Sequence, residues 1–101
     1  MSARDTGAIQ RQVKLEPRGR VFSHAEATRL FSQALTTCGD AQQVVIDLSG
    51  AEDATTSAFA KLVLLRRLLL RCGRDLCLTN LRDRAAGLFE VNRLGDVLPC
   101  A

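Results

Sequence analysis

The sequence contains no tryptophan and no tyrosine, and its four phenylalanines do not alternate with basic residues. Proteins that bind single-stranded nucleic acids stack the bases on such aromatic side chains, so we expect no stacking platform here. The net charge is only +3, and the lysines and arginines are scattered along the chain. We therefore interpret the basic excess as solvated surface and predict no nucleic-acid partner.

Long apolar runs are also missing. The most apolar stretch, Phe59 to Leu70, contains one lysine and two arginines. A membrane-spanning helix needs about 20 predominantly apolar residues, and the first residues lack the apolar segment of a secretory signal. We expect a soluble, cytoplasmic protein that is not itself a membrane protein.

Metal-ligating residues are few. The single histidine, His24, lies in the first turn of a predicted helix, and no two cysteines form a CxxC pair. Zinc sites use closely spaced ligands of this kind, so we predict no metal and no other cofactor. We interpret the four cysteines as reduced thiols in small apolar positions, with Cys100 as the exposed one.

A catalytic set is not evident either. The sequence has no Ser-His-Asp arrangement, no glycine loop that would cradle a phosphate, and no paired-carboxylate motif. A chain of 101 residues has room for one domain and little volume for a deep cleft. We predict a non-enzymatic protein with a flexible N-terminus at residues 1–7 and one folded domain at residues 8–101.

The first part of the chain predicts two strands and a helix. Polar and apolar residues alternate from Ile9 to Leu15, and a turn at 16–19 leads to a short returning strand at 20–22, which would form a hairpin at one edge of the sheet. Ser23 and Glu26 fit a capping box. The helix that they open would end at Gly39 and pack on the sheet through one apolar face: Ala27, Leu30, Phe31 and Leu35.

The second part alternates strands with helices. The continuous apolar run at 43–48 predicts a central strand covered on both faces, with Asp47 capping the next turn and a loop at 49–54. A helix over 56–72 and a strand over 75–79 follow. Asn80 would cap a last helix, closed by Gly95, with Leu81, Ala85, Leu88 and Phe89 on its apolar face.

This order of elements predicts an α/β domain with parallel central strands and right-handed crossovers. We expect a central mixed β-sheet of four to five strands, with three to four helices packed mainly on one face.

From Val44 the sequence runs Val-Val-Ile-Asp-Leu-Ser-Gly, and the hydroxyl cluster Thr55-Thr56-Ser57 follows at fixed spacing. This pattern resembles the signature of STAS domains, the family of anti-sigma factor antagonists and of sulfate-transporter tails. There, Asp-Leu-Ser-Gly precedes Asp-Ser-Ser-Gly-Leu-Gly at the start of a helix. By order of elements the resemblance covers about residues 8 to 99. It implies a small STAS-like fold that binds other proteins.

The resemblance places the phosphoacceptor of the family on Thr56, with Ser57 and Thr55 as alternatives. Two positions depart from the family: Thr55 stands where an acidic residue is usual, and Ala58 where a glycine is usual. The residues alone leave another interpretation open, because threonine is a favoured N-cap that contributes about 1 kcal/mol by accepting one backbone hydrogen bond.

The helix after this turn is apolar over most of its circumference. Arg67, Arg71 and Arg74 share one narrow arc, while leucines occupy both flanks. Either neighbouring helices cover these flanks, or one flank is an exposed patch for a partner. The predicted partner-binding residues belong to the turn and this helix: Glu52, Asp53, Thr55, Ser57, Phe59, Lys61, Leu64 and Leu68. For the two acidic residues, a solvated loop is the competing interpretation.

Two functions follow from the resemblance. The first is a regulatory module, similar to an anti-sigma factor antagonist, that binds an anti-sigma factor or related serine/threonine kinase and is switched by phosphorylation at the Thr56 turn. The second is a small STAS subunit of a membrane complex for lipid or anion transport, which docks on an ATPase or permease. Both are compatible with a homodimer.

Overall fold

The computed structural model describes residues 12–37 and 43–100. The predicted flexible N-terminus, Ile9, Cys38 and the helix stop at Gly39 lie outside the described residues. The elements in chain order are β2 (Gln12–Leu15), β3 (Val21–Phe22), α2 (His24–Thr37), β4 (Gln43–Asp47), β5 (Asp53–Ala54), α3 (Thr56–Arg71), β6 (Asp75–Thr79), α4 (Asp83–Val91) and a 3-10 turn (Leu94–Asp96).

The main sheet has three parallel strands in the order β2-β4-β6. The apolar strand β4 is the central one, as its continuous hydrophobic run predicts; Val44 pairs with Val13 on one side and with Leu76 on the other. The prediction that both faces of β4 are covered holds for one face only: Val44 and Ile46 are fully buried, whereas Val45, on the opposite face, is half-buried. The α/β class with parallel central strands is therefore confirmed.

The predicted hairpin between the first two strands is wrong. Strand β3 pairs in parallel with β5, a two-residue strand inside the segment predicted as loop, and the two form a sheet of their own. The amide of Thr55 donates to the carbonyl of Phe22 at 3.1 Å. The fully buried Phe22 ring explains this arrangement, because it must reach the core beneath α3 rather than lie beside β2 at the sheet edge. The five described strands thus form two parallel sheets rather than one mixed sheet.

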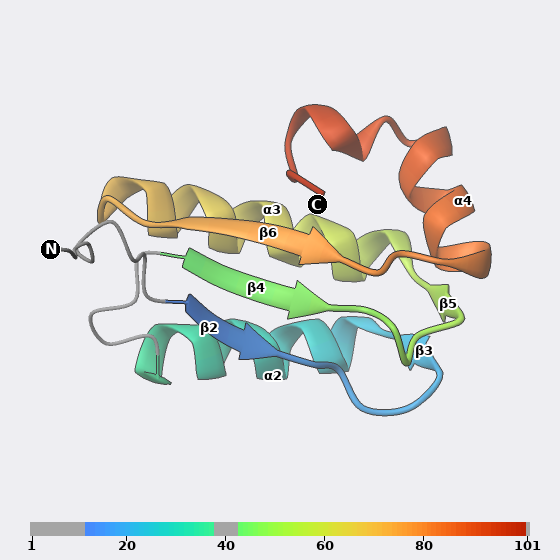
Figure 1. Cartoon of the computed structure of the whole chain (residues 1–101), viewed down its shortest axis with the longest axis horizontal. Coiled ribbons are helices and arrows are strands. Elements are labelled where there is room, and N and C mark those ends of the chain that lie inside the picture. Colours follow the sequence, from blue (N-terminus) through green and yellow to red (C-terminus); the bar gives the residue numbers. More distant parts are fainter. Residues whose placement is uncertain (1–11, 38–42, 101) are drawn as a thin grey trace, which may run out of the picture.

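Helices α2 and α3 cover the same face of the main sheet, and α4 lies beyond the carboxyl end of the strands, next to β5 (Figure 1). The strand side chains that face the helices form the centre of the core: Leu15, Val44, Ile46, Leu76 and Leu78. Two of the three described helices thus pack on one face, in agreement with the predicted arrangement.

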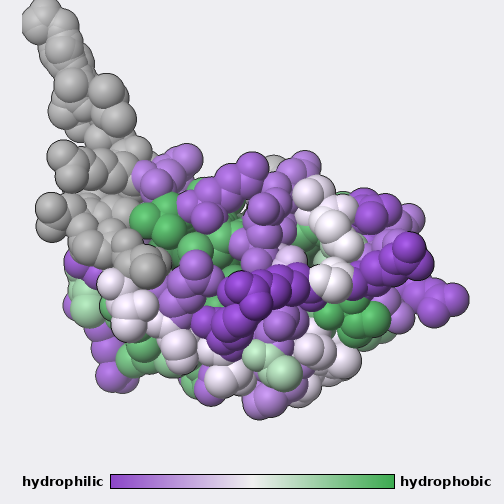
Figure 2. Space-filling model, turned by 90° about the horizontal axis from the view of Figure 1, so that it is seen from below, coloured by the Kyte–Doolittle hydropathy of each residue, from purple (hydrophilic) through white to green (hydrophobic). Residues whose placement is uncertain are grey.

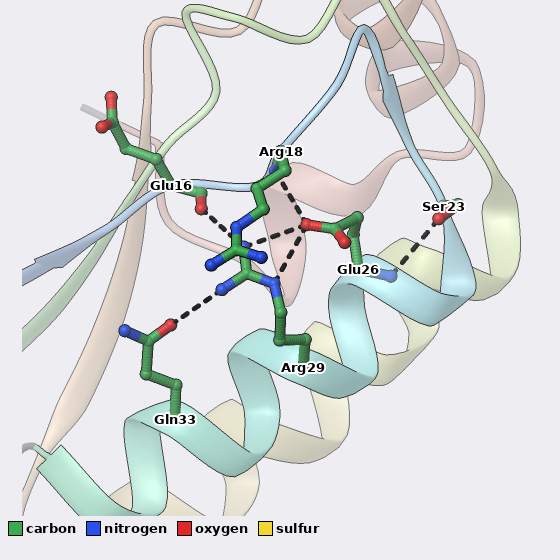
Figure 3. A network of polar contacts seen from close by, with 6 residues as sticks. All are labelled: Glu16, Arg18, Ser23, Glu26, Arg29 and Gln33. Atoms are coloured by element: carbon green, nitrogen blue, oxygen red, sulfur yellow. Dashed lines mark hydrogen bonds and ion pairs between the residues drawn. The ribbon is translucent and has the colours of Figure 1, made fainter.

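Helix α2 begins with half of the predicted capping box. The amide of Glu26 donates to Ser23 Oγ at 3.3 Å. The Glu26 carboxylate does not return to Ser23; it accepts from the amide of Arg18 at 2.7 Å and from Arg29 Nη2 at 2.9 Å (Figure 3). Arg29 also donates to the carbonyl of Glu16 at 3.0 Å, so this network ties the loop after β2 to the helix (Figure 3). The pKa of Glu26 is lowered, chiefly because its carboxylate accepts from the Arg18 amide and from Arg29.

The buried face of α2 is shifted from the predicted one. Ala27, Leu30 and Ala34 are fully buried, whereas Leu35 is 48% exposed and Phe31 is half-buried. Residues three and four apart share a helix face, and the smaller Ala34 allows α2 to approach the sheet and α3.

The last helix differs from the prediction at both ends. Asn80 adopts a left-handed conformation (φ 60°) and its amide nitrogen donates to Asp47, so it does not cap the helix. Arg82 is the N-cap residue, without a side-chain capping bond. At the other end the chain turns at Arg93 (φ 53°), and Gly95 lies in the 3-10 turn instead of closing the helix.

After the 3-10 turn the chain returns to the main sheet. The amide of Leu78 donates to the carbonyl of Pro99 at 2.8 Å, and Leu78 forms a parallel bridge with Cys100. Leu98 is fully buried. This segment therefore covers the free edge of β6.

The described cysteines agree only partly with the prediction. Cys77 is buried and Cys100 is exposed, as expected. Cys72 is exposed, not in an apolar position, because it follows the last turn of α3. Burial raises the pKa of the Cys77 thiol.

Candidate functional site

The turn from β5 into α3 is held by backbone and side-chain bonds that use Thr55. This residue is extended (φ −109°, ψ 153°) and is the N-cap of α3. Its Oγ1 accepts from the amide of Ala58 at 3.2 Å. Thr55 therefore fills the capping role that the residue type predicts.

Thr56 is exposed like Thr55, but its hydroxyl differs in hydrogen bonding. It is the first residue of α3, its side chain is exposed, and its hydroxyl makes no hydrogen bond within the described part of the chain. The neighbouring Ser57 is exposed as well, but its Oγ lies 3.3 Å from Thr55 Oγ1 and shares a hydrogen bond with it. The hydroxyl of Thr56 is thus available, while those of its two neighbours are engaged.

A shallow hollow of about 330 Å³ lies beside this turn, where β3, β5 and the start of α4 meet. Glu52 and Asp53 line it together with two arginines from distant parts of the sequence. Arg20 Nε lies 3.7 Å from a Glu52 oxygen, and Arg84 Nη1 lies 3.7 Å from an Asp53 oxygen. The acidic pair is therefore partly neutralised, and no local sequence pattern connects it to these arginines.

The carbonyl of Glu52 also fixes α4. It accepts from the amides of Arg84 and Ala85 at 3.0 and 3.3 Å, which satisfies two of the unpaired donors at the start of that helix. The segment predicted as a solvated loop is therefore exposed at the surface and also holds the start of α4 in place.

At the carboxyl end of β4 a polar cluster surrounds Asp47, which is 5% exposed. Its Oδ1 accepts from Asn80 Nδ2 at 3.0 Å and from the amide of Ser49 at 2.9 Å, and Lys14 Nζ lies 3.1 Å from its Oδ2. These hydrogen bonds, that from Asn80 first, hold the pKa of Asp47 well below its usual range. The predicted capping role of Asp47 is confirmed, because its carboxylate accepts from the amide of Ser49 in the turn that follows β4.

The predicted binding residues of α3 divide between core and surface. Phe59 is fully buried, with its ring 5.8 Å from those of Phe22 and Phe89, so the prediction that it contacts a partner is wrong. Lys61 is half-buried, and its Nζ lies over the Phe31 ring of α2 at 4.6 Å from the centroid. Leu64 and Leu68 are 50% and 38% exposed.

Within residues 12–37 and 43–100 no group of three histidine, cysteine, aspartate or glutamate side chains could hold a metal ion. In the same part of the chain no helix is both long and apolar enough to cross a bilayer.

Comparisons with known proteins agree with the fold. No protein-family model matches the sequence, and a search of curated proteins finds no significant match. Among solved structures, the chain is similar to the crystal structure of a sulfate transporter family protein from Wolinella succinogenes, with a TM-score of 0.73 and 16% identity. The similarity covers 92% of this chain and 78% of the other. The chain therefore has the α/β fold that the STAS resemblance implies.

Proposed function

We propose that this chain is a non-enzymatic regulatory protein-binding module, similar to an anti-sigma factor antagonist, that docks through the α3 turn at Thr55–Ser57 and the exposed side of α3. The observation that carries the proposal is the exposed hydroxyl of Thr56, which has no hydrogen-bond partner among the described residues, at the first position of a 16-residue helix. Thr55 next to it supplies the N-cap, so the fold does not need Thr56 for this purpose.

Phosphorylation of Thr56 would act through electrostatics. A phosphate adds about −1.5 to −2 charge at neutral pH, and the start of a helix presents unpaired N–H groups with partial positive charge. The modified turn keeps its helix but meets a partner with a new anion at the centre of the contact. A partner whose contact surface is acidic or desolvated would then dissociate, because the phosphate repels the acidic groups or cannot be buried against the desolvated ones.

A serine/threonine kinase of the anti-sigma type fits this chemistry as the partner. A second candidate is a subunit of a membrane transport complex that docks on an ATPase or permease. Two observations favour it: the similar solved structure is a sulfate transporter family protein, and Thr55 occupies the position of the usual acidic residue before the acceptor.

Affinity capture with the intact protein, followed by mass spectrometry, tests the proposal. We expect a kinase partner that places one phosphate on the chain, and we expect Thr56→Ala to abolish that phosphate. We also expect Thr56→Glu to weaken capture at least tenfold, with Thr36→Glu, another exposed helical threonine, as the matched control.

Two results would each contradict a part of this proposal. A phosphate that persists in Thr56→Ala would move the acceptor to Ser57 or Thr55. Capture of an ATPase or permease, without any phosphate, would favour the transport subunit.

A further inference from the structure

We propose that the outer side of the α2–α3 pair binds an acidic amphipathic helix of a partner protein. This inference rests on the proposed protein-binding function and specifies the chemistry of the partner. The surface consists of five residues, which we call the α2–α3 strip: Phe31, Leu35, Lys61, Leu64 and Leu68.

Contacts between the helices place these residues side by side. Helices α2 and α3 run in the same direction across one face of the sheet (Figure 1), and Lys61 Nζ lies 4.6 Å from the centre of the Phe31 ring. Leu35 follows Phe31 by one helical turn, while Leu64 and Leu68 follow Lys61 by one and two turns. The strip therefore extends along both helices from the contact between Phe31 and Lys61.

The strip is accessible and mostly apolar. Leu35, Leu64 and Leu68 are 48%, 50% and 38% exposed, although each belongs to a helix that packs its other side into the core. Apolar surface is gathered in separate patches among polar ones when the molecule is viewed from its α2 side (Figure 2). Clustered apolar residues of this kind mark interaction surfaces more often than single exposed leucines do.

Charge identifies the occupant. Helix α3 has no acidic residue, and by helical spacing Arg67 and Arg71 lie on the side of Leu64 that faces away from α2. Both are exposed and form no ion pair within the described residues. The one acidic residue of α2, Glu26, is already bound to Arg29. The strip thus has a positive border without a compensating carboxylate nearby on either helix.

An acidic amphipathic helix matches both features. Leucines at i, i+3, i+4 and i+7 would cover the strip, and glutamates beside them would reach Arg67 and Arg71. A second copy of this chain fits less well, because a symmetric contact would bring these arginines near one another with no acidic residue on α3. A membrane surface also fits less well, because the chain has no tryptophan or tyrosine to anchor at a lipid interface.

The test uses the intact ¹⁵N-labelled chain and two synthetic helical peptides with leucines at that spacing. One carries glutamate and the other lysine at the flanking positions. We expect the acidic peptide to bind with a Kd of roughly 10–100 µM, with amide shifts concentrated along the α2–α3 strip. We expect at least tenfold weaker binding by Leu64→Ser/Leu68→Ser, and no change for Leu70→Ser, which is 48% exposed on the other flank of α3.

Charge reversal supplies an independent readout. Arg67→Glu/Arg71→Glu should prefer the lysine peptide, whereas Arg93→Glu, at an exposed position outside the strip, should keep the preference for the acidic peptide. Circular dichroism of each variant confirms that the helices are retained.

Several outcomes would overturn the inference: equal binding of both peptides, no binding of the acidic one, or binding that the leucine variants leave unchanged. Tighter binding to vesicles of phosphatidylglycerol than to the acidic peptide would make the strip a membrane contact, and dimerisation lost in the leucine variants would make it a self-contact. If Thr56→Glu abolishes capture of a partner that Leu64→Ser/Leu68→Ser still binds, the proposed regulatory docking at the Thr56 turn stands and this inference fails.

Discussion

Asp47 and Thr56 are polar residues near the same end of the main sheet, but they differ in burial and in hydrogen bonding. Asp47 is buried and accepts hydrogen bonds from Ser49 and Asn80, while Lys14 compensates its charge. Thr56 is exposed and has no hydrogen-bond partner for its hydroxyl among the described residues. Substitution at Asp47 should therefore affect folding, and substitution at Thr56 should affect binding.

Replacing Asp47 with asparagine should lower the free energy of unfolding by roughly 1–3 kcal/mol at pH 7, because charge-assisted hydrogen bonds to a buried group are lost. Since the folded pKa of Asp47 lies below the unfolded value of about 3.9, its contribution is complete above that pH and declines as the pH falls. Urea titrations at pH 7, 4 and 2.5 should show the difference from the wild type shrinking with pH. Asp96→Asn, at an exposed position, is the control; a difference independent of pH would contradict this account.

At the scale of elements, the irregular segment after α4 is an integral part of the packed domain. Arg66 of α3 bonds both Asp75 of β6, at 2.8 Å, and the carbonyl of Val97, at 3.0 Å. Leu98 then enters the core beside β6. Helix, strand and terminal segment are thereby joined around one guanidinium group.

We expect Leu98→Ala to reduce the free energy of unfolding by about 2–5 kcal/mol, the cost of removing a fully buried leucine. Val97→Ala, one residue away and 38% exposed, should cost less than about 1 kcal/mol. Urea unfolding followed by far-UV circular dichroism measures both. Equal effects of the two substitutions would show that the terminal segment does not seal the core.

For the whole molecule, three phenylalanines connect parts that the backbone pairing leaves separate. Phe22 belongs to the two-stranded sheet, Phe59 to α3 and Phe89 to α4, and adjacent ring centres lie 5.8 Å apart in edge-on contact. Aromatic pairs of this geometry add about 0.5–1.5 kcal/mol beyond burial. The small sheet and α4 should therefore unfold together with the main sheet.

Phe59→Ala should destabilise the protein by about 3–5 kcal/mol, which is a large part of the stability of a typical domain. Phe59→Leu should cost less and keep the domain folded, so that hydrogen exchange can be measured. We expect amides of β3, β5 and α4 to lose protection in step with those of β4. Loss confined to α4 would show that the domain consists of two independently stable parts.

Features that depend on neighbouring residues can be predicted from the sequence alone. The apolar run of β4, the apolar face of α3 and the threonine at its start specify a central strand, a helix and its N-cap, because each depends on side chains within a few positions. The STAS-like spacing around Thr56 was equally visible.

Which surfaces remain open depends instead on contacts between segments that are distant in the sequence. The pairing of β3 with β5 depends on where Phe22 can be buried, and the exposure of Leu35 depends on how closely α2 approaches α3. Phe59 and Leu64 are equally apolar positions of one helix, yet one lies in the core and the other at the surface. Burial is set by contacts between distant segments, so a local pattern identifies apolar residues but not the side of the helix that a partner can reach.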